Sequence, residues 1–140
     1  MRYLMMVKAS GFTEAGIGTS REYAAKMRLY RHELKQAGVF LAHEELQPSS
    51  AGLRVDYPTG GGEAEVWPGP FSIDQGLLAG FILMDVDTEE EALQWALRMP
   101  VPAGQGAYGI ELRRLEERLE QSRDARQAAM ELELKNYLQL

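Results

Sequence analysis

Residues 77–86, LLAGFILMDV, form a segment that is hydrophobic at both odd and even positions over most of its length. Successive side chains of a β-strand point to opposite faces of the sheet, so a strand of this composition is shielded from water on both faces. The segment therefore predicts a central strand. Such a strand is covered on both faces, or lies between a layer of helices and a partner surface.

Shorter patterns predict the strands and loops around this segment. Apolar or alternating stretches at residues 2–9, 39–46 and 107–115 predict three further strands. The stretches LRVDY and EAEVW, which alternate apolar and polar residues on either side of PTGGG, predict a hairpin with one face in water. The glycine-containing stretch SGFTEAGIG, after the first strand, is predicted to be a loop.

Two helices are predicted from their start signals and apolar stripes. The first covers residues 19–38 and begins with a capping box formed by Thr19 and Glu22. The second covers residues 87–100 and begins with a similar box at Thr88. The first helix has one face that is expected to be buried, consisting of Tyr23, Met27, Tyr30 and Leu34.

The order of these elements predicts an α+β fold. Two strand–helix–strand units in succession describe a ferredoxin-like βαββαβ domain, here with a β-hairpin inserted between its second and third strands. Residues 1–115 are expected to form this domain, and residues 116–140 an extra C-terminal helix, because they are rich in helix formers and lack Gly and Pro. Helices on one face leave the other face of the sheet bare, so we expect a homodimer through that face.

Charge and composition exclude several classes of function. Fifteen basic and 21 acidic side chains give a formal charge of −6 without a basic patch, so neither nucleic acid nor a membrane is expected as a partner. The absence of cysteine excludes disulfides, thiolate nucleophiles and Cys-ligated zinc. Two histidines without a third ligand predict no metal site, and no cofactor is expected. No apolar run suits a signal peptide or a membrane span, so a cytoplasmic location is expected.

The turn before the central strand has the sequence WPGPF. Pro68 and Pro70 fix φ and lack a backbone donor, so this segment is expected to cross from the hairpin to the central strand without pairing in a sheet. Gly69 permits backbone conformations that a side chain forbids. The turn is therefore explained by structure alone, without any chemistry.

Several segments together resemble the YCII-related family, which carries a DGPF motif. They are RYLMMVKAS, GVFLAHEELQPSSAGLRV, and the stretch from GPFSIDQG to MPVP, and the resemblance covers residues 1–115. It implies a bacterial protein and a dimeric α/β barrel, in which two ferredoxin-like sheets pack face to face around a central cleft. Gly69, Pro70 and Phe71 match the motif, whereas Pro68 replaces its aspartate. Because relatives in the wider group are thought to use a His and Asp pair, this replacement lowers the expectation of acid–base chemistry.

His43 is the candidate general base. Glu44 and Glu45 follow it, and strand alternation allows only one of these acids to share its side. Asp74 is the alternative acid. A surface histidine at a strand end is the simpler interpretation and the one we favour. His32 is expected on the solvent face of the first helix, without a function.

Four residues are candidates for ligand binding. Ser72 and Asp74, just past the motif, would place a hydroxyl and a carboxylate at the mouth of the cleft. Arg54 and Tyr108 would offer a charge and a phenol to an acidic ligand. The simpler interpretations are ordinary loop polarity, a solvent-facing arginine and a core tyrosine.

Three functions are compatible with these observations. The preferred one is a homodimeric module that binds a small molecule or a protein partner, in or near the dimer cleft, without catalysis. The first alternative is a lyase or isomerase acting on a small organic acid, with His43 as the base and Asp74 or Glu45 orienting it. The second, implied by the resemblance, is an accessory to an extracytoplasmic-function sigma factor that acts through the C-terminal helix.

Overall fold

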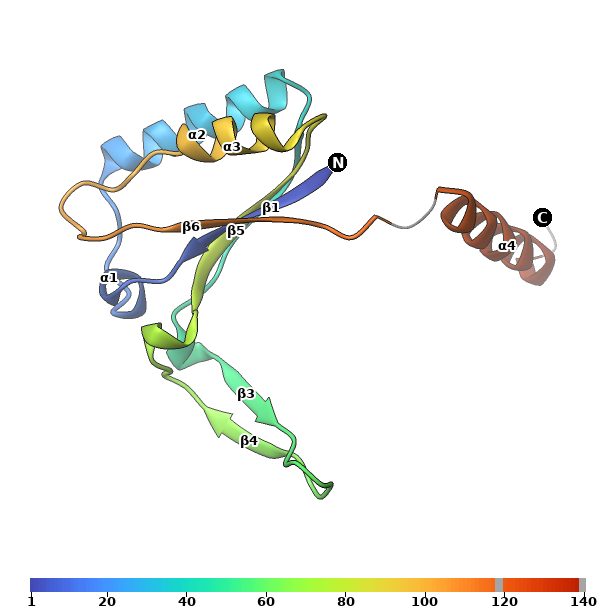
Figure 1. Cartoon of the computed structure of the whole chain (residues 1–140), viewed down its shortest axis with the longest axis horizontal. Helices are drawn as coiled ribbons and strands as arrows, with labels where there is room; N and C mark the ends of the chain where they lie inside the picture. The colour runs from blue at the N-terminus through green and yellow to red at the C-terminus, as the bar shows by residue number, and fades with distance from the viewer. Residues whose placement is uncertain (118–119, 139–140) are drawn as a thin grey trace.

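The computed structural model describes residues 1–117 and 120–138 and shows an antiparallel sheet with helices on one side (Figure 1). The mixed architecture confirms the α+β class. With η denoting a 3₁₀ turn, the elements are β1 (Arg2–Lys8), α1 (Gly11–Glu14), α2 (Arg21–Gln36), β2 (Phe40–Glu45), η1 (Ser49–Ala51), β3 (Leu53–Asp56), β4 (Glu65–Pro68), η2 (Ile73–Gln75), β5 (Leu78–Asp85), α3 (Glu89–Leu97), β6 (Ile110–Arg114) and α4 (Glu120–Leu138).

The main sheet has the strand order β2-β5-β1-β6, and its neighbouring strands are antiparallel. The predicted central strand, β5, lies between β2 and β1. Met5 of β1 lies opposite Ile82 of β5 and Leu112 of β6, and directly opposed residues of antiparallel strands share a face. This register assigns Met5, Ile82 and Leu112 to the face that the helices cover.

The core lies between the sheet and the helices α2 and α3, which lie side by side (Figure 1). The predicted stripe of α2 is confirmed, because Met27, Tyr30 and Leu34 are buried. The Tyr30 hydroxyl donates a hydrogen bond of 2.6 Å to the carbonyl oxygen of Trp95 in α3. Four large side chains have almost no exposed surface: Met5, Leu34, Ile82 and Met84.

Helix capping differs from the prediction at two places. The cap of α2 is Ser20, whose Oγ accepts a hydrogen bond of 3.1 Å from the Tyr23 amide, so the assignment to Thr19 was wrong by one residue. The stretch predicted as a loop contains the short helix α1. This helix begins with a reciprocal capping box between Ser10 and Thr13. The Ser10 and Thr13 spacing is a start signal that the glycines around it obscured.

The other face of the main sheet carries no helix. Leu4 lies opposite Leu83, and Met6 lies opposite Phe81, so these four side chains share the face turned away from α2 and α3. The apolar character of both faces of β5 is thus explained on one side by the helix layer. The partner expected on the bare side stays a prediction.

The β3–β4 hairpin extends away from the body on the side opposite α2 and α3 (Figure 1). Its apolar side chains are exposed, so the prediction that one of its faces is covered is wrong for the single chain. Pro68 pairs with Leu53 as the last residue of β4, which corrects the expectation that it cannot pair. Pairing is possible because both strands of this sheet are edges, where a missing amide donor is tolerated.

The predicted C-terminal extension, residues 116–140, contains α4. Residues 118–119 and 139–140 of this extension lie outside the described residues. Among the described side chains of α4, Met130, Leu134 and Tyr137 are exposed. Of the described helices, none combines the length and apolar character needed to cross a membrane.

Candidate functional site

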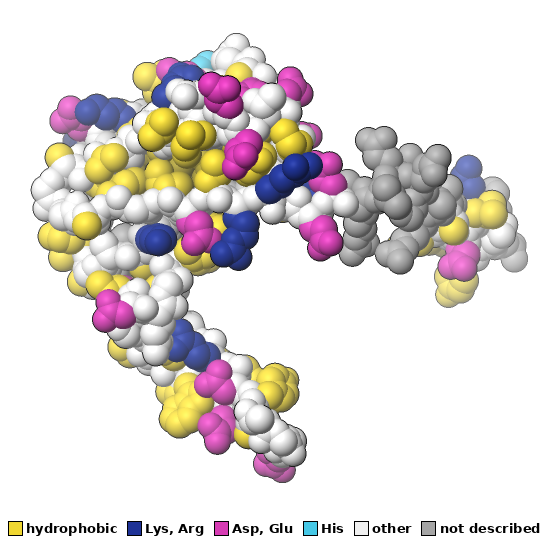
Figure 2. Space-filling view, in the orientation of Figure 1, with side chains coloured by type: hydrophobic (Ala, Val, Ile, Leu, Met, Phe, Trp, Pro, Cys, Tyr) yellow, Lys and Arg dark blue, Asp and Glu magenta, His cyan; other side chains and the backbone are white. Residues whose placement is uncertain are grey.

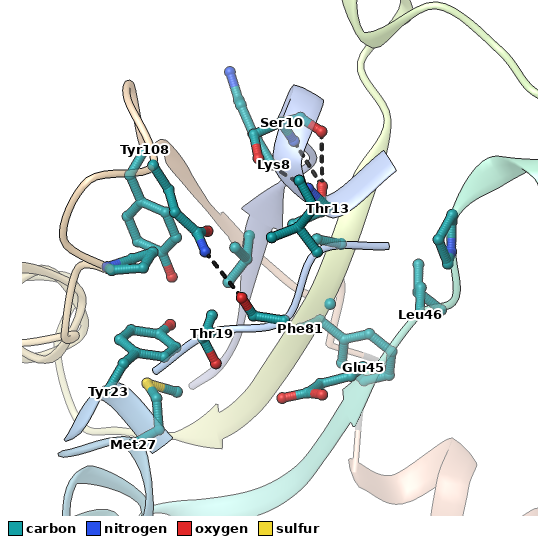
Figure 3. A pocket seen from close by; sticks show the side chains of 18 of the residues that line it. Lys8, Ser10, Thr13, Thr19, Tyr23, Met27, Glu45, Leu46, Phe81 and Tyr108 are labelled. Carbon is teal, nitrogen blue, oxygen red and sulfur yellow. Dashed lines mark hydrogen bonds between the residues drawn. The ribbon is translucent and has the colours of Figure 1, made fainter. Parts of the chain in front are cut away.

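A cavity of about 320 Å³ lies at one end of the sheet, on the face that the helices cover. The ends of β1, β2 and β5 form its floor, and the start of α2 and the loops around residues 9–19 and 102–108 form its walls (Figure 3). Its size is at the lower end of the range for small-molecule sites. The polar residues that line it are Lys8, Ser10, Thr13, Thr19, Tyr23, His43, Glu45, Gln105 and Tyr108.

His43 lines this cavity, and strand register explains why. It lies opposite Ile82, so its imidazole is on the helix side of the sheet. Glu45, two residues further along β2, shares that side, with its Oε1 at 3.9 Å from His43 Nε2. This distance is too long for a direct hydrogen bond, and the Glu45 side chain is largely exposed.

The imidazole of His43 favours its neutral form. Burial lowers its pKa below the usual value of 6.5, and the positive charge of Arg31 lowers it further, whereas Glu45 and Glu44 act in the opposite direction. Burial is the largest of these effects. At neutral pH His43 therefore offers the cavity one hydrogen-bond donor and one acceptor without a charge.

Two tyrosines form the wall of the cavity near α2. Figure 3 shows the hydroxyl groups of Tyr23 and Tyr108 pointing toward each other. Burial raises the pKa of Tyr108, and the neighbouring Tyr23 raises it further, so the phenol keeps its proton. The Tyr108 hydroxyl lies 3.5 Å from Met99 Sδ, a weak acceptor. A ligand oxygen would be a stronger acceptor for this donor.

The other predicted ligand residues lie elsewhere, at the root of the hairpin. The Arg54 guanidinium stacks 4.0 Å from the centre of the Phe71 ring and donates a hydrogen bond to Gln75 Oε1. Ser72 Oγ accepts a hydrogen bond of 3.3 Å from the Asp74 amide. Arg54, Ser72 and Asp74 are not among the described residues that line the cavity. Of the predicted site residues, the structure thus brings together His43 and Tyr108 there.

The matched motif, Gly69, Pro70 and Phe71, forms a structural junction. The Phe71 amide donates a hydrogen bond of 2.8 Å to Ser49 Oγ, and the Ser49 amide donates to both carboxylate oxygens of Glu14, at 3.1 and 3.2 Å. A Cβ atom at Gly69 would lie 1.8 Å from the Ser49 carbonyl oxygen, so only glycine fits. The motif therefore anchors the hairpin to η1 and α1.

Sequence reasoning missed part of the cavity wall. Lys8 and Thr19 were not singled out for binding, and Tyr23 was assigned to the core alone. Their shared signal is position: each lies at the end of a strand or the start of a helix, near one end of the sheet. Ligand binding was predicted in or near a dimer cleft, and the cavity lies on the face of the sheet that the helices cover.

The arrangement suits the binding of a small, mostly uncharged group. Hydroxyl and imidazole groups share the lining with apolar side chains that include Val7, Met27 and Ile82. Within the described part of the chain, no group of three His, Asp or Glu side chains could hold a metal ion. Lys8 and Glu45 bring opposite charges to the lining, so the cavity has no dominant sign of charge.

The fold and cavity define a small α+β domain with a ligand-sized site between its sheet and its helices. The family model described as the YCII-related domain matches residues 1–111. The chain therefore belongs to the YCII-related family, as the sequence segments predicted. A comparison with curated proteins gave no match.

Proposed function

We propose that this protein is a homodimeric module that binds a small organic molecule in the cavity beside His43. The observation that carries this proposal is the cavity of about 320 Å³, in which neutral His43 and protonated Tyr108 line an apolar floor. A few convergent polar groups in an apolar pocket are typical of small-molecule sites. Donors and acceptors without charge favour ligands that carry carbonyl or hydroxyl oxygens.

The dimer is proposed from the bare face of the sheet. The strand order β2-β5-β1-β6, with α2 and α3 on one face, is the order that a ferredoxin-like βαββαβ unit with an inserted hairpin requires. Leu4, Met6, Phe81 and Leu83 give the other face an apolar centre. Met6 is already buried in the single chain, and Leu4, Phe81 and Leu83 are half-buried. Packing two such faces together would cover these three and produce a dimeric α/β barrel, with one cavity in each subunit.

A second candidate function is proton transfer by His43 on a small organic acid. Its lowered pKa keeps His43 in the basic, neutral form near pH 7, and its place in the cavity wall would put it beside a bound substrate. Glu45, at 3.9 Å, would act as the orienting acid after a small movement or through one water molecule. An accessory role in sigma-factor regulation stays a prediction, which deletion of residues 116–140 would test.

A ligand screen by thermal shift tests the binding proposal. Small organic acids and neutral carbonyl compounds are added one at a time to the wild-type protein, His43→Gln and Tyr108→Phe. A ligand at 100 times its dissociation constant stabilises the protein by about 2.7 kcal/mol. We expect a hit whose shift falls in both variants and persists in His32→Gln, a matched control on α2. A hit that is unaffected by both cavity variants would contradict the proposal.

Turnover distinguishes the two functions. For a binding module, the bound compound is recovered unchanged after prolonged incubation with the wild-type protein. For a proton-transfer enzyme, NMR detects conversion of the compound, or exchange of its acidic hydrogen with deuterated solvent. His43→Gln should abolish that conversion while leaving a weakened thermal shift.

A further inference from the structure

The β3–β4 hairpin has one wholly apolar face. Val55 lies opposite Val66, and Leu53 lies opposite Pro68, so these four side chains share that face. Leu53 is 70% exposed, Val55 50% and Val66 59%. Figure 2 shows hydrophobic side chains along the projecting hairpin. Clustered exposure of this kind, unlike a single exposed leucine, indicates a contact surface.

The opposite face of the hairpin carries three charged side chains and one tryptophan. Asp56 lies directly opposite Glu65, and Arg54 lies opposite Trp67. Two carboxylates in a directly opposed pair repel each other, so this face is suited to water. Acids on the hairpin also oppose contact with nucleic acid or anionic lipid. The apolar face is therefore suited to a protein surface.

The hairpin is joined to the body at its root. The Glu14, Ser49 and Phe71 hydrogen bonds and the close approach of Gly69 to Ser49 fix that root. Beyond it, β3 and β4 pair only with each other. An isolated two-stranded hairpin is at best marginally stable in water. A surface packed against its apolar face would therefore stabilise the hairpin.

The bare sheet face is small for a dimer interface on its own. Strands of five to eight residues, about 4.8 Å apart and rising about 3.3 Å per residue, give four strands a face of roughly 20 by 20 Å, or about 400 Å². A stable interface buries about 800 Å² on each partner. Even with the additional accessible area of protruding side chains, this face alone lies at the small end for a stable dimer.

The hairpin lies where it can supply the missing area. It projects on the same side of the sheet as the bare face (Figure 1), and Figure 2 shows an open hollow between the hairpin and the body. A second copy seated on the bare face would occupy this hollow. In a two-fold symmetric dimer the same contact occurs twice, so the hairpin of each chain would pack against the body of the other.

We propose that the β3–β4 hairpin is a dimerisation arm, which packs Leu53, Val55 and Val66 against the body of a second copy of this chain. This inference rests on the proposed homodimer and adds to it a second contact surface. The geometry of the root, in which the backbone of Gly69 lies close to that of Ser49, holds the arm in the orientation that this contact needs.

Paired double variants test the arm. Val55→Ser with Val66→Ser alters its apolar face, and Asp56→Ser with Glu65→Ser alters the opposite face of the same two strands. Sedimentation velocity over a concentration series gives the dimer dissociation constant of each. We expect an increase of about tenfold or more for the apolar-face variant, since four buried valines are lost per dimer, and a change of less than about twofold for the control.

The outcomes separate the arm from the dimer itself. If the wild-type protein is a dimer and the two double variants have equal dissociation constants, the proposed role of the arm is wrong and the homodimer is still supported. A wild-type protein that is monomeric throughout would overturn both. Circular dichroism confirms that each variant is folded, which the exposure of the altered side chains leads us to expect.

A cross-link supplies an independent measurement. The chain has no cysteine, so Val55→Cys carries a single thiol, to which a short photoreactive group is attached. Illumination should give a covalent dimer from this position and much less from Asp56→Cys, which points the label to the opposite face. Equal yields from both positions, or a yield of other complexes but no dimer, would contradict docking of the arm on a second copy.

Discussion

The main sheet and the β3–β4 hairpin are both antiparallel and both carry apolar side chains, yet they differ in what covers them. In the main sheet, Met5, Ile82 and Met84 are buried beneath α2 and α3. In the hairpin, Leu53 and Val55 are exposed. Alternation thus predicts a strand and its apolar face, but it leaves open which surface covers that face.

Truncation of a core side chain should have the largest effect on stability. Met84→Ala removes a fully buried side chain from β5 and leaves a cavity, so we expect a loss of about 2–5 kcal/mol in the free energy of unfolding. Val55→Ala in the hairpin, measured by urea denaturation at a concentration where the protein is monomeric, should cost far less. Equal losses of unfolding free energy in the two variants would show that the hairpin is buried within the single chain, and would contradict the difference between the main sheet and the hairpin.

Gly69→Ala should be the most damaging change at the root of the hairpin. The new Cβ would lie 1.8 Å from the Ser49 carbonyl oxygen, so the backbone must move, at a cost of about 1–3 kcal/mol. Gly11→Ala is the control, because a Cβ there has no neighbour within 4 Å. Thermal unfolding of both variants measures the difference. Similar melting temperatures for the two would contradict the proposed close approach.

Ser49→Ala tests the hydrogen bonds that hold the root of the hairpin. It removes the acceptor of the Phe71 amide and one donor to Glu14, and we expect a loss of about 1–2 kcal/mol. Ser50→Ala alters the adjacent, exposed residue of η1 and should have almost no effect. Chemical denaturation compares the two variants. A destabilised Ser50→Ala beside an unchanged Ser49→Ala would exclude this hydrogen-bond network as the anchor.

The pH dependence of stability should show the smallest effect. Since the pKa of His43 is lowered on folding, the unfolded chain binds this proton more readily, and stability is lost as pH falls from 6.5 through the lower folded-state pKa. The wild-type protein should therefore lose more stability between pH 7 and pH 5 than His43→Gln. Urea denaturation across this range measures both, and parallel curves would show that His43 is not buried in the folded state.

Much of the fold could be predicted because its signals are local. The apolar residues of β5, the stripe of α2 and the Thr88 cap of α3 each predict an element, and the structure confirms them. The position of the α2 cap was wrong because Thr19 and Ser20 are both suitable hydroxyl residues. The local pattern does not decide between them, and Thr19 instead lines the cavity.

The candidate site could be predicted only in part, because it is assembled from distant segments. His43 and Tyr108 were singled out by side-chain chemistry. Strand register brings His43 to the helix face of the sheet, whereas Tyr108 reaches the cavity from the loop before β6. Ser72, Asp74 and Arg54 were chosen for their proximity to the motif, whose position at the root of the hairpin is not visible in a linear pattern. Tyr23 fits an apolar stripe equally well whether it packs in a core or borders a cavity.

The measurement that tests binding in the cavity most directly is histidine NMR during ligand titration. The chain has two histidines: His43 in the cavity wall, and His32 on the outer face of α2, where it serves as an internal reference. Each hit of the thermal-shift screen is titrated into the wild-type protein at constant pH. We expect the imidazole signals of His43 to shift in a saturable manner while those of His32 stay in place. Saturable stabilisation that leaves the His43 signals unchanged would place the ligand elsewhere and contradict the account.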